Sequence, residues 1–248
     1  MTTAKTKLHF SRFEFKYVLP KALRDEVESE LLHFLELDPY VAEQPGHEYL
    51  VRSLYFDDPA QTAFHDKLDG LHTRSKFRLR TYSDDPQVGA PWFLEIKGRY
   101  NNLVFKHRAP VVENGGPPDP SATDITKQLL ALTEPGKVRD GFEFQVFRRG
   151  IRPQVLIDYL RRPYVSKYDP EFRITFDNHL RATATDRLFP TRPASRRIVP
   201  GYTVLEVKFR YHVPSWFHRV LQAYELRRRS ISKICEGMQT LGLGEDPG

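Results

Sequence analysis

Residues 76–82, KFRLRTY, and residues 93–99, FLEIKGR, alternate charged and apolar side chains. Side chains two positions apart on a β-strand lie on the same face, whereas on a helix they do not. The alternation therefore predicts two strands, each with one charged and one apolar face. In the first strand the charged face is entirely basic, because it carries Lys76, Arg78 and Arg80.

The same two-faced pattern recurs in further segments of the chain. The apolar column of each segment is rich in aromatic side chains, and the polar column is mainly basic. With that of residues 93–99 included, the polar columns consist of Arg12, Glu14 and Lys16; of Glu95, Lys97 and Arg99; of Lys106 and Arg108; of Arg173, Thr175 and Asp177; and of Glu206, Lys208 and Arg210.

Segments with strand character cover most of the chain. They lie at residues 9–18, 47–57, 74–83, 91–99, 103–112, 153–164, 171–178 and 201–210. Apolar residues at helical spacing follow Pro20 and Pro214, and they also fill residues 125–132, which Ser121 or Thr123 is expected to cap, and residues 230–241. We expect a mainly β (α+β) fold, an eight-stranded antiparallel β-barrel tunnel with helices packed outside and a C-terminal helical segment. At 248 residues, a single domain over residues 1–248 is expected.

The overall charge favours an anionic partner. The 38 Lys+Arg residues against 32 Asp+Glu give a net charge of +6, which fits a phosphate ester, a nucleic acid or an anionic membrane. A single cysteine, Cys235, excludes an internal disulfide, so a reducing cytoplasm is the expected location. The first ten residues lack the apolar run of a signal peptide, and no stretch is apolar enough to span a bilayer. If the protein works at a membrane, a membrane-protein partner must anchor it.

The charged columns allow two interpretations. An antiparallel sheet commonly turns one apolar face to the core and one charged face to water. Solvated faces usually mix both signs, however, and these columns are predominantly basic. An eight-stranded barrel is wide enough for an interior ligand, so the cations can instead point inward. Desolvated cations are costly unless they are paired, and such an interior must therefore stay wet or hold an anion.

An ordered series of short motifs resembles a known family. The motifs are RFEFKY (12–17), RSLYFDD (52–58), KFRLRTY (76–82), FLEIKGR (93–99), VFKHR (104–108), DYLRRPY (158–164), FRITFD (172–177), LEVK (205–208) and ISK (231–233). Their order and spacing resemble the polyphosphate-polymerase domain of the vacuolar transporter chaperone (VTC) complex and its bacterial relatives. That domain belongs to the triphosphate tunnel metalloenzyme, or CYTH-like, superfamily, and the resemblance covers nearly the entire chain.

The resemblance implies roles for individual residues. Glu206 would help to hold Mn²⁺ or Mg²⁺, with Glu14, Glu95 and Glu143 as further metal ligands. Lys233 would reach the transferring phosphate and, with Glu206 and Lys208, would make up the catalytic set. The phosphate-binding residues implied by the resemblance are Lys16, Arg78, Arg80, Lys97, Lys106, Arg161 and Arg173.

Two positions depart from the superfamily pattern. Tunnel hydrolases typically show E-x-E-x-K in the first motif, and Arg12 stands where the first glutamate would be. Losing that acid removes a candidate metal ligand for activating water, which favours the polymerase-like branch over hydrolysis. Eukaryotic relatives often carry a lysine shortly before the C-terminal Ser-Lys, where this chain has arginines at residues 227–229.

The resemblance implies an ATP-dependent polyphosphate polymerase, a transferase that moves the γ-phosphate of ATP onto a growing phosphate chain. Its partners would be ATP and pyrophosphate or polyphosphate. One alternative is a tunnel hydrolase that acts on triphosphates or nucleotides, and another is a non-catalytic module that binds polyphosphate. Nucleic acid is not expected, because no reading motif accompanies the arginine runs. The chain also lacks an H-E-x-x-H pair, a G-x-x-x-x-G-K-[ST] loop and a G-x-S-x-G elbow.

Overall fold

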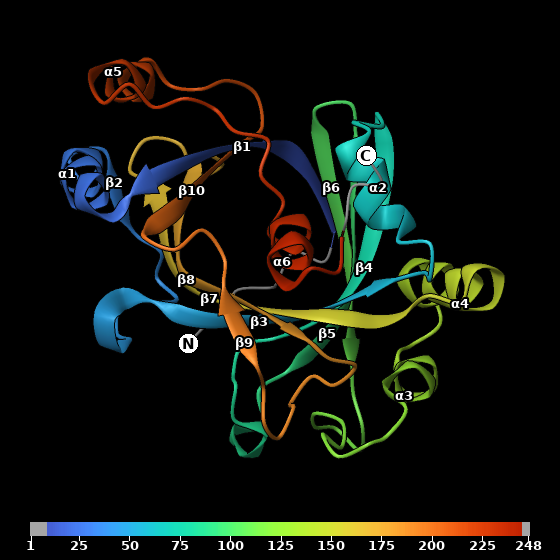
Figure 1. Cartoon of the computed structure of the whole chain (residues 1–248). Helices are drawn as coiled ribbons and strands as arrows, with labels where there is room; N and C mark the ends of the chain where they lie inside the picture. The colour runs from blue at the N-terminus through green and yellow to red at the C-terminus, as the bar shows by residue number, and fades with distance from the viewer. Residues whose placement is uncertain (1–8, 245–248) are drawn as a thin grey trace. The chain divides into compact units, whose positions relative to one another are not determined.

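The computed structural model describes residues 9–244, and Figure 1 shows their arrangement into helices and strands. The chain forms two compact units, each assembled from separate segments. Within the described residues, unit 1 consists of 9–11, Ser53–Leu156 and Thr185–Arg192, and unit 2 consists of Arg12–Arg52, Ile157–Ala184 and 193–244. The expectation of a single domain stays a prediction.

Ten strands pair in the order β2-β7-β3-β4-β5-β6-β1-β10-β8-β9. A further pairing of β7 with β8 joins the ladder into a closed ring of eight strands, with β2 and β9 as additions. The expected fold, a mainly β protein built on an eight-stranded antiparallel barrel, is confirmed. The strands are β1 (His9–Pro20), β2 (Leu35–Leu37), β3 (Tyr49–Asp57), β4 (Thr73–Thr81), β5 (Trp92–Tyr100), β6 (Leu103–Val111), β7 (Arg152–Ser166), β8 (Arg173–Ala184), β9 (Ser195–Arg197) and β10 (Tyr202–Phe209).

All eight strands expected from side-chain alternation are present, with ends that shift by a few residues. The two short strands β2 and β9 were not expected, because three residues are too few to show an alternating pattern. Both of them pair with longer strands of unit 2, β2 with β7 and β9 with β8.

The helices of unit 1 are α2 (Thr62–Leu68), α3 (Ile125–Leu132) and α4 (Lys137–Arg149), and a short 3₁₀ turn spans Pro86–Val88. Helices α3 and α4 cover the apolar face of its strands. Leu129 of α3 and Phe142 of α4 are fully buried in a core with Leu79 and Leu94 of the sheet. Helix α4 was not expected from the sequence, because exposed Phe144 breaks its apolar periodicity.

Aspartates fix where two of these helices begin. Asp124, rather than Ser121 or Thr123, caps α3, since its side chain accepts a hydrogen bond from the Lys127 backbone N–H. The carboxylate of Asp57, at the end of β3, accepts hydrogen bonds from the backbone N–H groups of residues 58, 63 and 64. Asp57 therefore ties the strand to the start of α2.

The helices of unit 2 lie on both faces of its strands. Helices α1 (Lys21–Leu31) and α5 (Ser215–Ala223) supply Leu31 and Phe217 to an apolar core with Phe176 and Leu205. A 3₁₀ turn spans Pro45–His47. Helix α6 (Lys233–Leu241) contacts β8 and β9, and Figure 1 shows its position in the fold. It begins at Lys233, whose side chain donates a hydrogen bond to Glu206 of β10. None of the described helices has the length and apolar character required to cross a membrane.

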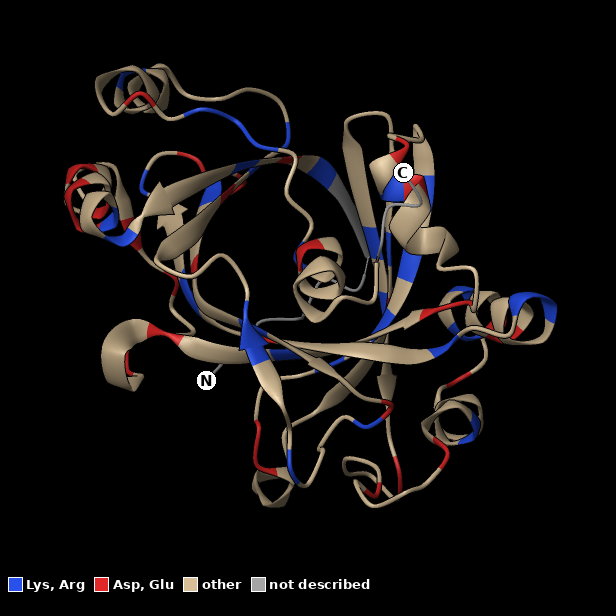
Figure 2. Cartoon of the chain, viewed as in Figure 1, with Lys and Arg blue, Asp and Glu red and all other residues tan. Residues whose placement is uncertain are grey.

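The central residues of the charged columns are buried, so these residues do not form a solvated face, whereas Arg173 and Arg210 at the strand ends are exposed. Glu95 has no exposed surface, and Arg78 and Arg80 are only 5% and 6% exposed. In unit 2, Glu206 and Lys208 are 3% and 5% exposed. Figure 2 shows that basic residues recur along the strands as well as at the surface of the helices.

Gly98 of β5 provides the space for an aromatic side chain on β6. Gly98 lies directly opposite Phe105, and a Cβ atom at Gly98 would overlap the Phe105 ring. Overpacking of this kind forces the ring or the backbone to move. Gly116, by contrast, has its nearest atom at an ordinary 3.8 Å from an added Cβ.

We expect Gly98→Ala to lower the free energy of unfolding by about 1–3 kcal/mol, measured by urea denaturation. The matched control, Gly116→Ala, is expected to change it little. In a Phe105→Ala background the cost of Gly98→Ala should largely disappear, because the overlapping ring is gone. An equal cost in both backgrounds would contradict the steric explanation.

Candidate polyanion-binding site

Strand register in unit 1 places basic residues side by side. Residues directly opposite in antiparallel strands share a face and lie close together. Lys97 of β5 is opposite Lys76 of β4 and Lys106 of β6, so three lysines form one row across the sheet. The neighbouring row consists of Arg78, Glu95 and Arg108. Like charges directly opposite one another are destabilising, and the single carboxylate in the second row offsets only part of this repulsion.

Glu95 is the centre of the cationic cluster of unit 1. One of its oxygens lies 2.6 Å from Nη2 of Arg78 and 3.8 Å from Nη1 of Arg80. The other lies 2.8 Å from Nη2 of Arg108 and 3.2 Å from Nζ of Lys106. We call these five residues the Glu95 cluster. Four cations around one carboxylate leave a formal surplus of three positive charges.

Hydroxyl groups surround the guanidinium groups of the Glu95 cluster. Arg78 donates a hydrogen bond of 3.0 Å to the Tyr55 hydroxyl, and Arg80 donates one of 3.0 Å to the Ser53 hydroxyl. Arg108 similarly donates to the Tyr82 hydroxyl over 3.1 Å. The buried Nε of Arg108 has no hydrogen-bond partner among the described residues. A buried donor without an acceptor is costly, and an anionic ligand would supply the missing oxygen.

Burial and neighbouring charges shift the pKa values of the Glu95 cluster. Burial alone would raise the pKa of Glu95, but the surrounding cations hold it well below its usual value of 4.5. Burial lowers the pKa of Lys106 to about 6; Glu95 opposes this shift, while Arg108, Arg80 and Arg78 add to it. The cluster therefore keeps its carboxylate ionised and disfavours the charge on its lysine.

In unit 2, register brings together residues of β1, β10 and β8. Glu206 of β10 lies opposite Lys16 of β1 and Thr175 of β8. Lys208 lies opposite Glu14 and Arg173 in the neighbouring row. The acidic residues thus alternate with basic ones on one face of three adjacent strands.

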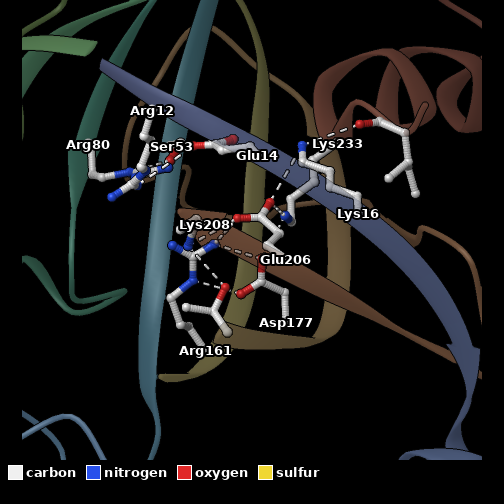
Figure 3. Close-up of polar contacts among 12 residues, drawn as sticks. Arg12, Glu14, Lys16, Ser53, Arg80, Arg161, Asp177, Glu206, Lys208 and Lys233 are labelled. Carbon is white, nitrogen blue, oxygen red and sulfur yellow. Dashed lines mark hydrogen bonds and ion pairs between the residues drawn. The ribbon is translucent and has the colours of Figure 1, made fainter. Parts of the chain in front are cut away.

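Glu206 and Asp177 together form the centre of a second cluster. The Lys233 ammonium is 2.6 Å from both carboxylates, and Figure 3 shows it directed at Glu206 from α6. Arg161 binds Asp177 through two hydrogen bonds of 2.7 Å and reaches Glu206 at 3.1 Å. Lys208 lies 3.3 Å and Lys16 lies 3.5 Å from Glu206. These six residues are the Glu206 cluster, in which four cations face two carboxylates and leave a surplus of two positive charges.

The pKa values of the two buried lysines of the Glu206 cluster are shifted in opposite directions. Burial alone would lower the pKa of Lys233, but Asp177 and Glu206 raise it above its usual value. Burial and Arg161 instead lower the pKa of Lys208 well below its usual value, although Glu206 opposes the shift. Lys233 is therefore held as a permanent cation, whereas the charge on Lys208 is disfavoured even though Glu206 lies 3.3 Å away.

The segment before α6 fixes Lys233 against β1. The backbone N–H of Arg229 donates to the carbonyl of Lys16 over 2.8 Å, and Nζ of Lys16 donates to the carbonyl of Ile231 over 3.3 Å. The guanidinium of Arg228 lies 3.9 Å from the centre of the Phe15 ring. In this structure the arginine run at 227–229 therefore anchors α6 to β1.

The structure places most of the predicted phosphate-binding residues in the two clusters. Arg78, Arg80 and Lys106 belong to the Glu95 cluster, with Lys97 in the adjacent lysine row; Lys16 and Arg161 belong to the Glu206 cluster. Arg173 lies beside Lys208 in the register, but its side chain is largely exposed and binds Asp38 at 2.6 Å. All three predicted catalytic residues, Lys233, Glu206 and Lys208, are in the Glu206 cluster.

The predicted metal ligands are distributed over both units. Glu95 is in the Glu95 cluster of unit 1, and Glu143 of the same unit pairs with Arg139 at 3.2 Å. Glu206 is in the Glu206 cluster of unit 2, where Glu14 pairs with Arg12 at 3.7 Å. Within residues 9–244 there is no group of three histidine, cysteine, aspartate or glutamate side chains able to hold a metal ion by themselves. Metal binding through these residues stays a prediction.

Two members of the clusters, Asp177 and Arg108, were not among the predicted site residues, and neither was Tyr55, whose hydroxyl accepts a hydrogen bond from Arg78. Asp177 and Arg108 occur in the alternating polar columns, so the pattern placed them on the correct face. Their partners were not apparent, because Asp177 meets Lys233 from a helix far along the chain. Tyr55 lies on β3, and its uncharged side chain does not form part of a basic column in the sequence.

We expect Glu95→Gln to lower the free energy of unfolding by at least about 3 kcal/mol at neutral pH, because it leaves four buried cations without their carboxylate. The pKa of Glu95 is depressed, so its stabilisation is complete above the usual value of 4.5 and is lost as the pH falls through the folded-state pKa. The difference between the two proteins should therefore shrink in strong acid.

Urea denaturation at several pH values measures this difference, and Glu143→Gln is the matched control. Glu143 pairs with Arg139 on α4 with a half-exposed side chain, so its loss should cost less than about 1 kcal/mol. Added tripolyphosphate should restore part of the stability of the Glu95→Gln protein. Equal effects of the two substitutions would contradict the account of the Glu95 cluster.

Comparisons with known proteins identify the family. The VTC domain profile matches residues 11–242. A Bacillus halodurans protein, provisionally described as an adenylate cyclase, has a TM-score of 0.55 at 12% identity over 90% of this chain and 94% of that one. A Pyrococcus horikoshii protein has a TM-score of 0.47 at 11% identity, over 91% and 96% of the two chains.

The Bacillus likeness supports the fold and says nothing of activity. No curated protein sequence matches the chain. The VTC profile covers all but the two ends of the sequence, in agreement with the ordered motifs and the closed ring of strands. The chain therefore belongs to the VTC domain family.

Proposed function

We propose that this protein is a polyphosphate polymerase that transfers the γ-phosphoryl group of ATP to a growing phosphate chain. The observation that carries the proposal is the buried excess of positive charge, which both units contain. The Glu95 cluster has four cations for one carboxylate, and the Glu206 cluster has four for two. Burial of unpaired positive charges raises the free energy of an empty site, and a ligand with many negative charges offsets this penalty.

The chemistry of the cationic groups favours phosphate among anions. The Glu95 cluster contains three guanidinium groups, those of Arg78, Arg80 and Arg108, whose planar donors match phosphate oxygens in pairs. A phosphate chain offers such oxygens at regular intervals, so one ligand can satisfy several guanidinium groups at once. Membership in the VTC domain family supports the same phosphate-handling function.

Phosphoryl transfer mainly requires positioning and neutralisation of charge, and the Glu206 cluster offers both. Lys233 is held between Glu206 and Asp177 and keeps its proton, so its role is to stabilise charge on the moving phosphoryl group and not to act as a base. Arg161 is aligned by its two hydrogen bonds to Asp177. Lys208, whose charge is disfavoured in the cluster despite Glu206, would gain a second counter-ion when phosphate binds.

A divalent ion fits this cluster only together with substrate. Both carboxylates already contact cations, and a set of two carboxylates among four cations does not form an all-protein metal cage. Mg²⁺ commonly binds through one or two carboxylates plus phosphate oxygens, which is the combination available here. We propose Glu206 as the ligand from the protein for Mn²⁺ or Mg²⁺. When bound, the ion would neutralise charge on the phosphate oxygens.

We expect the purified protein to make long phosphate polymers when it is incubated with ATP and Mn²⁺, detected by gel electrophoresis with a polyphosphate stain. Orthophosphate released without polymer would instead indicate a tunnel hydrolase. Tight binding of tripolyphosphate without any turnover would indicate a non-catalytic binding module. Either result would reject the polymerase proposal.

We expect Glu206→Gln to lower metal-dependent turnover by at least about 100-fold, since the metal and the aligned Lys233 both depend on this carboxylate. Glu236→Gln, in the first turn of the same helix as Lys233, is the matched control and should leave turnover nearly unchanged. Steady-state rates over a Mn²⁺ titration measure both variants. Full activity of Glu206→Gln with an unchanged Mn²⁺ dependence would reject the assigned role.

A further inference from the structure

Tyr55 contacts the Glu95 cluster through Arg78 but has no assigned role there. It is on β3, only 5% exposed, and its hydroxyl oxygen accepts a hydrogen bond of 3.0 Å from Nη1 of Arg78. The same guanidinium binds Glu95 through Nε at 2.7 Å and Nη2 at 2.6 Å. Arg78 is therefore held between a carboxylate and a phenol.

The hydroxyl proton of Tyr55 is available to a ligand. Because Arg78 donates to the phenolic oxygen, the O–H bond must point away from that guanidinium. Among the described residues no acceptor is recorded for this proton. Buried tyrosine hydroxyls usually find a partner, so a donor of this kind beside several cations is placed to meet an anionic oxygen.

We propose that Tyr55 is a further ligand of the phosphate chain, whose hydroxyl donates a hydrogen bond to a phosphate oxygen and which takes up a proton from solvent when the chain binds. This inference rests on the proposed phosphate-binding function of the Glu95 cluster. It concerns binding alone, and it requires neither ATP nor a metal ion.

The charges around Tyr55 explain why its hydroxyl takes up a proton when phosphate binds. Burial alone would raise its pKa, but Arg78, Arg80 and Lys76 of β4 lower the pKa to about 7. Behind them lie Glu95 and Lys97 of β5 and Lys106 and Arg108 of β6. In the empty protein the phenol is therefore ionised above neutral pH. A bound phosphate offsets the cations, raises the pKa and restores the O–H group.

The sign of the pH dependence follows from this linkage. Above about pH 7, binding must be accompanied by protonation of Tyr55, so the affinity for phosphate falls as the pH rises. Lys106 contributes in the same direction, because its pKa is about 6 in the empty cluster and bound phosphate would raise it. The two contributions are separable, since a substitution at Tyr55 leaves the Lys106 contribution in place.

The test is titration calorimetry of the metal-free full chain with tripolyphosphate, in pairs of buffers that differ in ionisation enthalpy. At about pH 8 the wild-type protein should take up nearly one proton more than Tyr55→Phe, and near pH 6 this difference should vanish. Tyr55→Phe should bind about tenfold more weakly near pH 6, through the lost hydrogen bond. Near pH 8 it should bind about as well as wild type, because it needs no protonation.

Tyr82→Phe is the matched control, because the Tyr82 hydroxyl accepts from Arg108 in the same cluster. It should retain the wild-type proton uptake, and the thermal unfolding of both variants checks that they fold. Equal proton uptake by wild type and Tyr55→Phe at about pH 8 would overturn the role of Tyr55 alone. Failure of the wild-type protein to bind tripolyphosphate would overturn the proposed function as well.

Discussion

A carboxylate buried among several cations is the interaction on which both units depend. Without Glu95 or Glu206, lysine and arginine side chains on neighbouring strands would face one another with little water between them. Buried ion pairs of this kind add little net stability, because desolvation of the charges offsets most of their attraction. An arrangement with more cations than carboxylates is thus poorly explained by stability, and it is well explained by an anionic ligand.

The two clusters differ in ways that suit different tasks. The Glu95 cluster has three guanidinium groups, each donating to a hydroxyl, and a single carboxylate. The Glu206 cluster has three lysines and one arginine around two carboxylates. Guanidinium groups fix the orientation of phosphate, whereas ammonium groups act as compact point charges. This difference suits the first cluster to binding and orienting phosphate. It suits the second cluster to neutralising charge on the phosphoryl group in the proposed transfer.

Burial of the excess positive charge has a free-energy cost in both clusters, which the proposed anionic ligand would offset. Burial lowers the pKa values of Lys106 and Lys208, so each empty cluster disfavours one of its own positive charges. Lys233 is the opposite case, because two carboxylates at 2.6 Å hold its proton. Under the proposed function, binding of phosphate to either cluster would therefore be linked to protonation of its lysine.

The sequence by itself determined the eight long strands and which residues share a face of each. Alternation with period two is a local property, and it is legible wherever a strand is long enough to repeat it. The family motifs, in turn, indicated most of the residues that the clusters contain. Helix α4 was not predicted, because its exposed aromatic residues interrupt the apolar periodicity. The strands β2 and β9 were not predicted, because three residues are too few to show alternation.

Only the tertiary structure decided which charges meet. Glu206 and Lys233 are 27 positions apart and come from a strand and a helix, so no spacing rule connects them. The lysine row of β4, β5 and β6 depends on strand register, and a shift of one residue would move each side chain to the other face. The burial that lowers the pKa of Lys106 and raises the cost of an empty cluster arises from packing between distant segments, which a linear pattern does not contain.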